Sequence, residues 1–300
     1  MTVSSPKTRQ PVEKTAGRRR ALALLKSRPS LIGSLITFAA VILIGLVLPS
    51  LAPQNPYDMT SYSVMDNLLP PGSQSFDGTT FWLGTDPQGR DMVSAILYGM
   101  RISLIVGLLS TAAAMIIGVC VGLTAAVFGG LVETLLMRLV DFILGFPSIL
   151  VALVLLTVLG RGVDKVILAI IMVQWAHYAR IMRSSALTEL RKEYVEAARN
   201  LGYSKLRIMF RHIMPNSLSA VLVVCTIQVA SAITLEATLS FLGVGVPVTH
   251  PSLGLLVASG FDYLLSGEYW ISFYPGIALV FLVFTPNLVG DRLRRSLDPK

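Results

Sequence analysis

The chain has 300 residues, of which 53% are hydrophobic and 14% are charged, and its mean hydropathy is +0.68. A soluble globular protein carries about one quarter charged residues, so this composition excludes a soluble domain and indicates a lipid bilayer as the solvent. The net charge is +8, but no basic patch with interleaved aromatic residues lies away from the hydrophobic runs, which argues against nucleic acid as a partner. Cys120 and Cys225 lie inside apolar runs and are expected to be buried and unbridged.

Long uncharged runs predict the membrane spans. A hydrocarbon core about 30 Å thick needs about 20 consecutive apolar residues per helix. In chain order, such runs lie at 31–52, 102–132, 142–160, 166–179 and 269–290. The run 166–179 is the shortest, and it spans if Arg180 and Arg183 extend their side chains to the inner surface.

The stretch 212–261 carries a single charged residue and is long enough for one span or two. The positive-inside rule decides between them. Eight basic residues precede residue 29, eight lie between positions 180 and 211, and four follow position 290. If all three segments are cytoplasmic, an even number of spans follows the middle one. We therefore predict one span at 216–241, a broken segment rich in Gly and Pro at 243–254, and six spans in total with both termini inside.

The polar segment 193–216 predicts two short helices. Apolar residues recur at helical spacing on both sides of Gly202, which is expected to end the first helix in the left-handed conformation. Ser204 is expected to cap the second helix, and Pro215 to close it and open the fifth span.

The plainer alternative for this pair is an amphipathic helix resting on lipid headgroups. Against it, the acidic residues Glu189, Glu193 and Glu196 would be repelled by anionic lipid. The small residues Ala197 and Ala198 would also allow another protein to approach closely. We therefore favour a docking site for a protein.

Before the second span, Asp86 and Pro87 indicate the start of an amphipathic helix. The Asp86 side chain is a suitable cap, and Pro87 has no backbone N–H that would need a partner in the first turn. Deep in the fifth span, Glu236 is the lone carboxylate and is expected to pair with a polar residue of another span or of a partner chain; a proton relay is the sharper alternative. Gly118 and Gly122 fit close helix packing. The sequence has no nucleotide-binding GxxxxGK[ST], no metal-ligand cluster and no nucleophile–base set.

One resemblance lies in the helix pair. Glu196, Ala197, Ala198 and Gly202, with Pro215 thirteen residues further on, resemble the EAA loop of ABC-importer permeases. In that family the loop forms a coupling helix that sits in a cleft of the ATPase subunit. Carried over by position, the resemblance implies that these residues, together with Tyr194 and Leu201, contact an ATPase. His212 and Met214 stand where the general pattern has Ile and Leu.

Further motifs resemble the C-type permease of dipeptide, oligopeptide and nickel importers. They are LGTD-x-x-GRD-x-x-S at 83–94, G-x-R-x-SL at 99–104, TLEATLSFLGVGV at 234–246, and NLVGDRLRRSLDP near the end. The first of them supplies an outer-loop signature made of Gly84, Asp86, Gly89, Arg90 and Asp91. This chain departs from the pattern at Leu253, where an aromatic residue is usual, and at Arg294 and Arg295, which replace a more acidic sequence.

The resemblance implies an all-α polytopic membrane protein with six transmembrane helices and the type I (MetI-like) permease fold. The expected division is a cytoplasmic basic tail 1–28, a first transmembrane helix 29–52, an extracytoplasmic loop with an amphipathic helix 53–101, a five-helix core 102–294 and a cytoplasmic tail 295–300. The core includes the cytoplasmic coupling loop 184–215.

The function implied is that of a non-catalytic permease subunit, half of the pathway of an importer for peptides or a related small solute. The resemblance places it in the bacterial inner membrane and implies three partners: a homologous B-type permease, one or two cytoplasmic ATPases that bind ATP and Mg, and an extracytoplasmic solute-binding protein. This chain itself is expected to bind no cofactor and no metal. A stand-alone secondary transporter or channel is the alternative. The sequence leaves the cargo open among dipeptides, longer peptides, glutathione, nickel chelates and opines.

Overall fold

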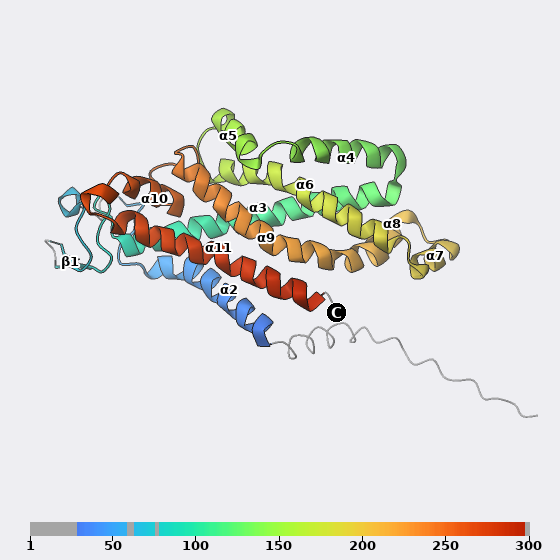
Figure 1. The fold of residues 1–300 in the computed structure, drawn as a ribbon, viewed down its shortest axis with the longest axis horizontal. Coiled ribbons are helices and arrows are strands. Elements are labelled where there is room, and N and C mark those ends of the chain that lie inside the picture. The colour runs from blue at the N-terminus through green and yellow to red at the C-terminus, as the bar shows by residue number, and fades with distance from the viewer. Residues whose placement is uncertain (1–28, 59–62, 76–77, 298–300) are drawn as a thin grey trace, which may run out of the picture.

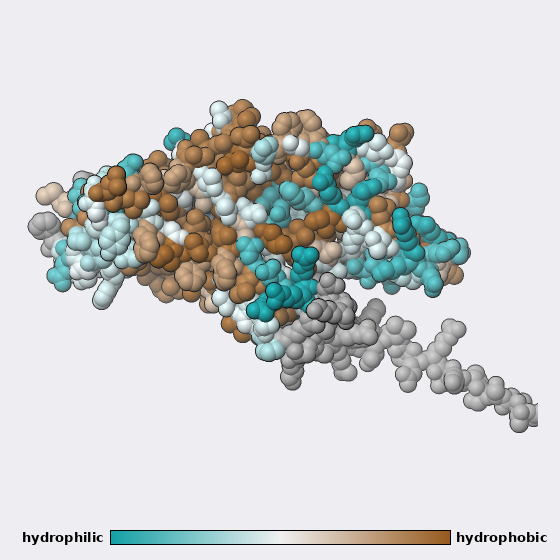
Figure 2. All heavy atoms as spheres, in the orientation of Figure 1, coloured by the Kyte–Doolittle hydropathy of each residue, from teal (hydrophilic) through white to brown (hydrophobic). Residues whose placement is uncertain are grey.

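A computed structural model describes residues 29–58, 63–75 and 78–297, so the predicted tail 1–28 and residues 298–300 lie outside the described ranges. The molecule is a long helical bundle, with β1 and α10 at one end and α7 and α8 at the other (Figure 1). Apolar side chains cover its middle, and polar ones gather at both ends (Figure 2). This distribution is the one that a bilayer imposes on a spanning bundle.

The long helices are α2 (Pro29–Val47), α3 (Met92–Phe128), α4 (Gly130–Leu144), α5 (Ser148–Leu159), α6 (Val163–Glu189), α9 (Met214–Phe241) and α11 (Trp270–Leu297). The shorter elements are η1 (Leu48–Leu51), η2 (Val64–Asp66), β1 (Ser73–Gln74), β2 (Thr80–Phe81), α7 (Glu193–Asn200), α8 (Lys205–Ile208), the π-turn η3 (Met209–Ile213), α10 (Leu253–Phe261) and η4 (Leu264–Ser266). The two strands form an antiparallel hairpin in which Ser73 lies opposite Phe81.

Close packing of α3 against α6 forms the centre of the bundle. A Cβ atom on Gly118 would lie 2.5 Å from the Cβ of Tyr178, and one on Gly122 would lie 2.9 Å from the Cβ of Met182. The predicted close-packing role of these two glycines is therefore confirmed. Because later residues of α3 meet later residues of α6, the two helices run parallel.

The third predicted span, 142–160, is not one helix. α4 ends at Leu144 and α5 begins at Ser148, and the two helices meet at an angle of 88°. Pro147, whose fixed backbone cannot continue a helix interior, lies at the break. Since α3 and α6 run parallel, the chain between them must return across the bundle, so we count the bent pair as one broken span. The described ranges then hold six spans, as predicted, and five if the pair is left out.

The second and fourth spans are longer than predicted. α3 begins at Met92 and is capped by the Asp91 side chain, which accepts from the Ser94 backbone N–H at 2.8 Å. The prediction of a cap at Asp86 is therefore wrong, and the expected separate amphipathic helix is the first part of α3. Cys120 is exposed on this helix, so the prediction that it is buried is also wrong, although both cysteines are unbridged.

α6 extends to Glu189, and its two arginines pair with α4 instead of extending freely to the surface. Arg180 Nη2 lies 2.6 Å from Asp141 Oδ1, and Arg183 Nε lies 2.7 Å from Glu133 Oε1. These pairs hold the polar face of α4 against α6. The outward face of α4 is apolar, with Leu131 81% exposed, as a lipid-facing surface requires.

The fifth span is continuous with the second helix of the short pair. α8, the π-turn and α9 together form one span candidate, Lys205–Phe241, and Pro215 lies in the first turn of α9 without interrupting it. The prediction that Pro215 separates two helices is wrong, because the helical run continues through it. The π-turn directly before Pro215, in which the Met214 N–H bonds to the Met209 carbonyl, shifts the hydrogen-bond pattern where the proline has no N–H to donate. The chain then turns at Gly243 into the nine-residue α10, which confirms the broken segment and leaves α9 and α11 as the last two spans.

A buried carboxylate joins this broken segment to the bundle. Glu236 is fully buried on α9, and its two oxygens accept from Ser103 Oγ of α3 at 2.7 Å and from Ser240 Oγ at 2.8 Å. Ser240 Oγ in turn accepts from the Val246 N–H at 3.3 Å, in the turn before α10. The expected polar partner on another span is therefore Ser103. Nearby, Leu253, the departure from the family pattern, is fully buried against Gly99 of α3.

Replacing Gly118 by Leu is expected to force α3 away from α6, because the new side chain has no space beside Tyr178. Overpacking of this kind costs about 1–3 kcal/mol or more. The yield of monodisperse protein in detergent and its Tm should both fall. Gly33→Leu is the matched control, because nothing lies within 4 Å of a Cβ built there. Equal yield and Tm for the two variants would contradict the packing account.

Replacing Glu236 by Ala is expected to lower Tm, because it leaves the hydroxyls of Ser103 and Ser240 without an acceptor. A buried donor left unpaired costs about 1–3 kcal/mol. Glu236→Gln keeps an acceptor of the same shape and should lose less. Ala at the exposed Asp262 serves as the surface control. Thermal unfolding in detergent gives the Tm of each variant. Identical Tm values for Glu236→Ala and Glu236→Gln would rule out a stabilising role for the hydrogen bonds of Glu236.

Candidate functional site

The helix pair α7 and α8 projects from one end of the bundle (Figure 1). α7 ends at Asn200, Gly202 has a φ of +76°, and Ser204 accepts from the Arg207 backbone N–H at 3.4 Å as the cap of α8. The predicted break between two short helices is thus present. At the turn, Leu201 is 73% exposed.

The two faces of α7 differ. Ala198 is buried against the bundle, whereas Glu196 and Ala197 are exposed. The expectation that both alanines leave room for a docked protein is therefore wrong for Ala198, whose small side chain lets α7 lie close to its own bundle. For the exposed Ala197 it stays a prediction. The exposed face, with the turn at Leu201, forms a protrusion that a concave partner surface could receive.

Tyr194 ties α7 to two membrane helices. Its hydroxyl donates to Glu189 Oε2 at the end of α6 at 2.6 Å, and it accepts from Asn216 Nδ2 in the first turn of α9 at 3.1 Å. Glu189 also accepts from Lys192 Nζ at 2.6 Å. Burial and the hydrogen bond to the Glu189 carboxylate raise the pKa of Tyr194, so its hydroxyl stays protonated and can donate. Tyr194 therefore links α7 to the end of α6 and to the first turn of α9.

His212 lies beside two tyrosines of this region. Its ring is stacked 6.1 Å from the Tyr203 ring and tilted 6.3 Å from the Tyr194 ring. Sequence comparison with the family pattern singled out this position because Ile is usual there. In this chain the aromatic contacts supply the packing that an aliphatic side chain would otherwise provide.

The outer-loop signature forms a buried turn at the opposite end. Asp86 Oδ1 accepts the backbone N–H groups of Gln88 and Arg90, both at 2.9 Å, and its Oδ2 accepts from Arg90 Nε at 2.6 Å. Both side chains are at least 94% buried. Breaking one of these contacts would leave a buried charge without its partner, so the contacts together stabilise this conformation of the turn.

This turn joins three parts of the chain. Trp270 Nε1, at the start of α11, donates to the Thr85 carbonyl at 3.1 Å, and the Asp91 N–H donates to Gln54 Oε1, after the first span, at 2.6 Å. A Cβ on Gly84 would lie 2.6 Å from the Leu69 carbonyl oxygen, and one on Gly89 would overlap the Ser63 carbonyl. The signature residues therefore fasten the outer loop to the starts of α3 and α11.

The predicted site residues thus fall in three places. Seven lie at or beside the α7–α8 pair, five lie in the outer turn, and Glu236 lies on α9, hydrogen-bonded to Ser103 of α3. The structure does not bring the three groups together. Among the described residues, no group of three or more His, Cys, Asp or Glu side chains could hold a metal ion.

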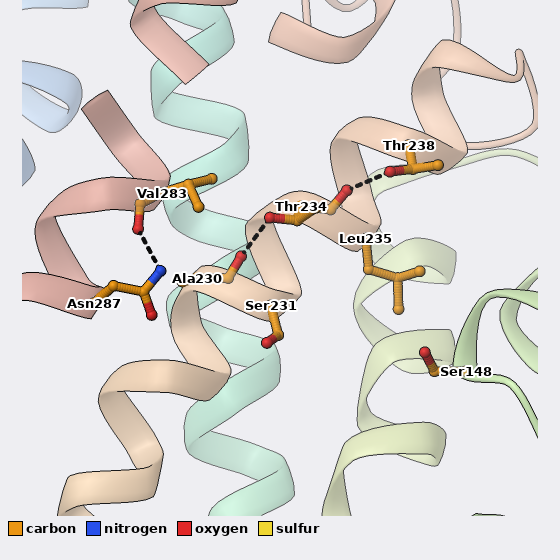
Figure 3. A pocket seen from close by; sticks show the side chains of 8 residues that line it. All are labelled: Ser148, Ala230, Ser231, Thr234, Leu235, Thr238, Val283 and Asn287. Carbon is orange, nitrogen blue, oxygen red and sulfur yellow. Dashed lines mark hydrogen bonds between the residues drawn. The ribbon is translucent and has the colours of Figure 1, made fainter. Parts of the chain in front are cut away.

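Sequence reasoning missed a fourth feature, a polar groove of about 300 Å³ between α5, α9 and α11 (Figure 3). It is lined by Ser148, Ala230, Ser231, Thr234, Leu235, Thr238, Val283 and Asn287. The signal was available in the predicted fifth span, because Ser231, Thr234 and Thr238 are spaced by three and four residues and so share one face of a helix.

Comparison with known proteins agrees with the fold and with the motifs. Residues 118–300 match the family described as binding-protein-dependent transport system inner membrane component. A di/tripeptide transport system permease protein of Pseudomonas aeruginosa is 37% identical over 270 residues, which cover 90% of this chain and 88% of that protein. A dipeptide transport system permease protein of Haemophilus influenzae is 34% identical over 275 residues, 92% of each.

Two solved structures share the fold. The inward-facing MetNI methionine ABC transporter matches with a TM-score of 0.56 at 21% identity, covering 69% of this chain and 98% of that chain. An amino acid ABC transporter matches with a TM-score of 0.52 at 16% identity, covering 68% and 94%.

These relatives do not favour a stand-alone secondary transporter or channel. They are named as inner membrane components or permease proteins of transport systems, and the solved structures are ABC transporters. The chain belongs to the family of binding-protein-dependent transport system inner membrane components, and it is a non-catalytic permease subunit of a bacterial inner-membrane ABC importer.

Proposed function

We propose that this chain forms half of the translocation pathway of a peptide importer and that α7 and α8 are its coupling site. The observation that carries the coupling assignment is the protruding helix pair whose Tyr194 is hydrogen-bonded to both α6 and α9. The peptide cargo is proposed from the relatives, two of which are named for di- or tripeptide transport.

The proposed assembly contains a homologous second permease, one or two ATPases that bind ATP and Mg, and an extracytoplasmic solute-binding protein. The ATPases receive the exposed face of α7 around Glu196, Ala197 and Leu201. The basic residues near α7, α8 and the end of α11 support a cytoplasmic location for that end and for both termini. The outer turn around Asp86 then faces the binding protein.

The mechanism is alternating access driven by the partner's nucleotide cycle. Closure of the ATPase pair moves α7, and the hydrogen bonds of Tyr194 carry this movement to α6 and α9. Since α6 is packed against α3 through Gly118 and Gly122, the helices tilt as a unit and do not slide past one another. The pathway opens outward to receive cargo, and hydrolysis returns it to the inward state.

Gly202→Asp is expected to abolish ATPase association while membrane insertion is retained. The φ of +76° disfavours a side chain at this position, and the new charge lies at the proposed dock. Gly267→Asp is the matched control, because Gly267 also has a positive φ and an open Cβ position but lies in the outer loop. Copurification of the ATPase from detergent extracts measures the effect. Normal copurification with Gly202→Asp would overturn the assignment of the dock.

Tyr194→Phe tests transmission separately from docking. It removes the hydroxyl that contacts Glu189 and Asn216 while leaving the ring in place. The ATPase should still copurify, but the amount of peptide taken up per ATP hydrolysed should fall several-fold in proteoliposomes. As the control, Tyr203→Phe removes a hydroxyl from the turn between α7 and α8 and should leave this ratio unchanged. An unchanged ratio for Tyr194→Phe would show that the hydrogen bonds carry no coupling.

A further inference from the structure

The polar groove of Figure 3 lies on a membrane helix. α9 passes between α11, which carries Asn287, and α5, which carries Ser148. Ser231 and Thr234 are exposed on its face, and Ala230 is buried behind them. Threonine hydroxyls can be satisfied by carbonyls of their own helix, but the exposed Ser231 hydroxyl and the Asn287 amide oxygen make no hydrogen bond among the described residues, and hydrocarbon offers them no partners. The face therefore suits water or a polar solute.

The groove presents both hydrogen-bond acceptors and donors. Thr234 Oγ1 donates its proton to the Ala230 carbonyl at 2.9 Å, and Thr238 Oγ1 donates to the Thr234 carbonyl at 2.7 Å (Figure 3). Asn287 Nδ2 donates to the Val283 carbonyl at 3.1 Å. A hydroxyl has one proton and two lone pairs, so the two threonines keep acceptor capacity and have no proton left to offer. The Oδ1 atom of Asn287 adds another acceptor, whereas its second Nδ2 proton and the hydroxyl protons of the lining serines are donors.

The groove is also neutral, because no Asp, Glu, Lys, Arg or His is among its lining residues. A solute would meet hydrogen-bond partners without forming an ion pair. Weak contacts at successive positions suit a pathway, since a group that binds too tightly cannot move on.

We propose that this groove is the part of the solute pathway contributed by this chain, and that it takes the backbone amide groups of a peptide. Each peptide amide carries one N–H donor and one C=O acceptor, which a surface with partners of both kinds complements. The inference rests on the proposed function and adds to it the residues that the cargo touches, Ser231, Thr234, Thr238 and Asn287. Because the lining is neutral, the groove accepts peptides regardless of side-chain charge.

The first test is aqueous access in the assembled importer. Ser231→Cys and Thr238→Cys are made singly in a background in which Cys120 and Cys225 are replaced by Ala, and are treated with a charged methanethiosulfonate reagent. Val280→Cys is the control, because Val280 is 67% exposed on α11 and does not line the groove. We expect the groove cysteines to react faster than the cysteine of Val280→Cys. A saturating concentration of peptide should slow their reaction, and the completed reaction should block peptide uptake.

The second test introduces charge. Ser231→Asp should raise the ratio of lysine-containing to glutamate-containing dipeptide uptake about fivefold, the effect of one solvated ion pair. Ser231→Asn, which is neutral, should leave this ratio unchanged. An unchanged ratio with Asp, or equal labelling at positions 231 and 280, would overturn the groove as the pathway. Absence of ATP-driven peptide uptake by the wild-type assembly would instead defeat the proposed function, so the two failures are distinguishable.

Discussion

The close contact of α3 and α6 is the constraint on which the rest of the structure depends. Gly118 and Gly122, spaced by four residues on α3, allow the two backbones to approach until Tyr178 and Met182 of α6 occupy the space where side chains would stand. In lipid, where burial of apolar surface gives helices little reason to associate, such packing is a main source of attraction. Because the two helices are parallel, the intervening chain must cross back, and it does so as the bent pair α4 and α5.

Both ends of this unit are fastened. At the end that carries α10, the buried pair of Asp86 and Arg90 holds the turn that leads into α3. Further along α3, Glu236 connects this helix through Ser103 to α9 and, through Ser240, to the turn before α10. At the other end, Tyr194 connects α7 to α6 and α9. A displacement of α7 would therefore move several spans together, and this is the physical basis of the coupling that we propose. The polar groove lies on α9, one of the helices so moved.

Sequence patterns predicted features that depend on local chemistry. The charge distribution predicted the number of spans. The positive φ of Gly202 was predicted because a glycine that follows the last apolar residue of a helix usually takes the left-handed conformation. Features set by distant contacts were missed or misplaced. The cap of α3 moved from Asp86 to Asp91 because Asp86 is occupied by Arg90, and the anchoring role of Tyr194 depends on partners from two other helices. The bend before Ser148 was signalled by Pro147 but was hidden in an uncharged run.

If α7 and α8 couple this permease to its motor, the α7–α8 turn lies in the cytoplasm and is covered by the ATPase. Single introduced cysteines can be labelled with an impermeant maleimide in the Cys120→Ala, Cys225→Ala background to determine this. Leu201→Cys and Leu265→Cys are suitable, because both native side chains are highly exposed and lie in the inner and outer turns. In intact cells the maleimide should label position 265 alone. In inside-out vesicles it should label position 201, and bound ATPase should protect that position. Labelling of position 201 from outside intact cells, or no protection by the ATPase, would contradict the proposed coupling site.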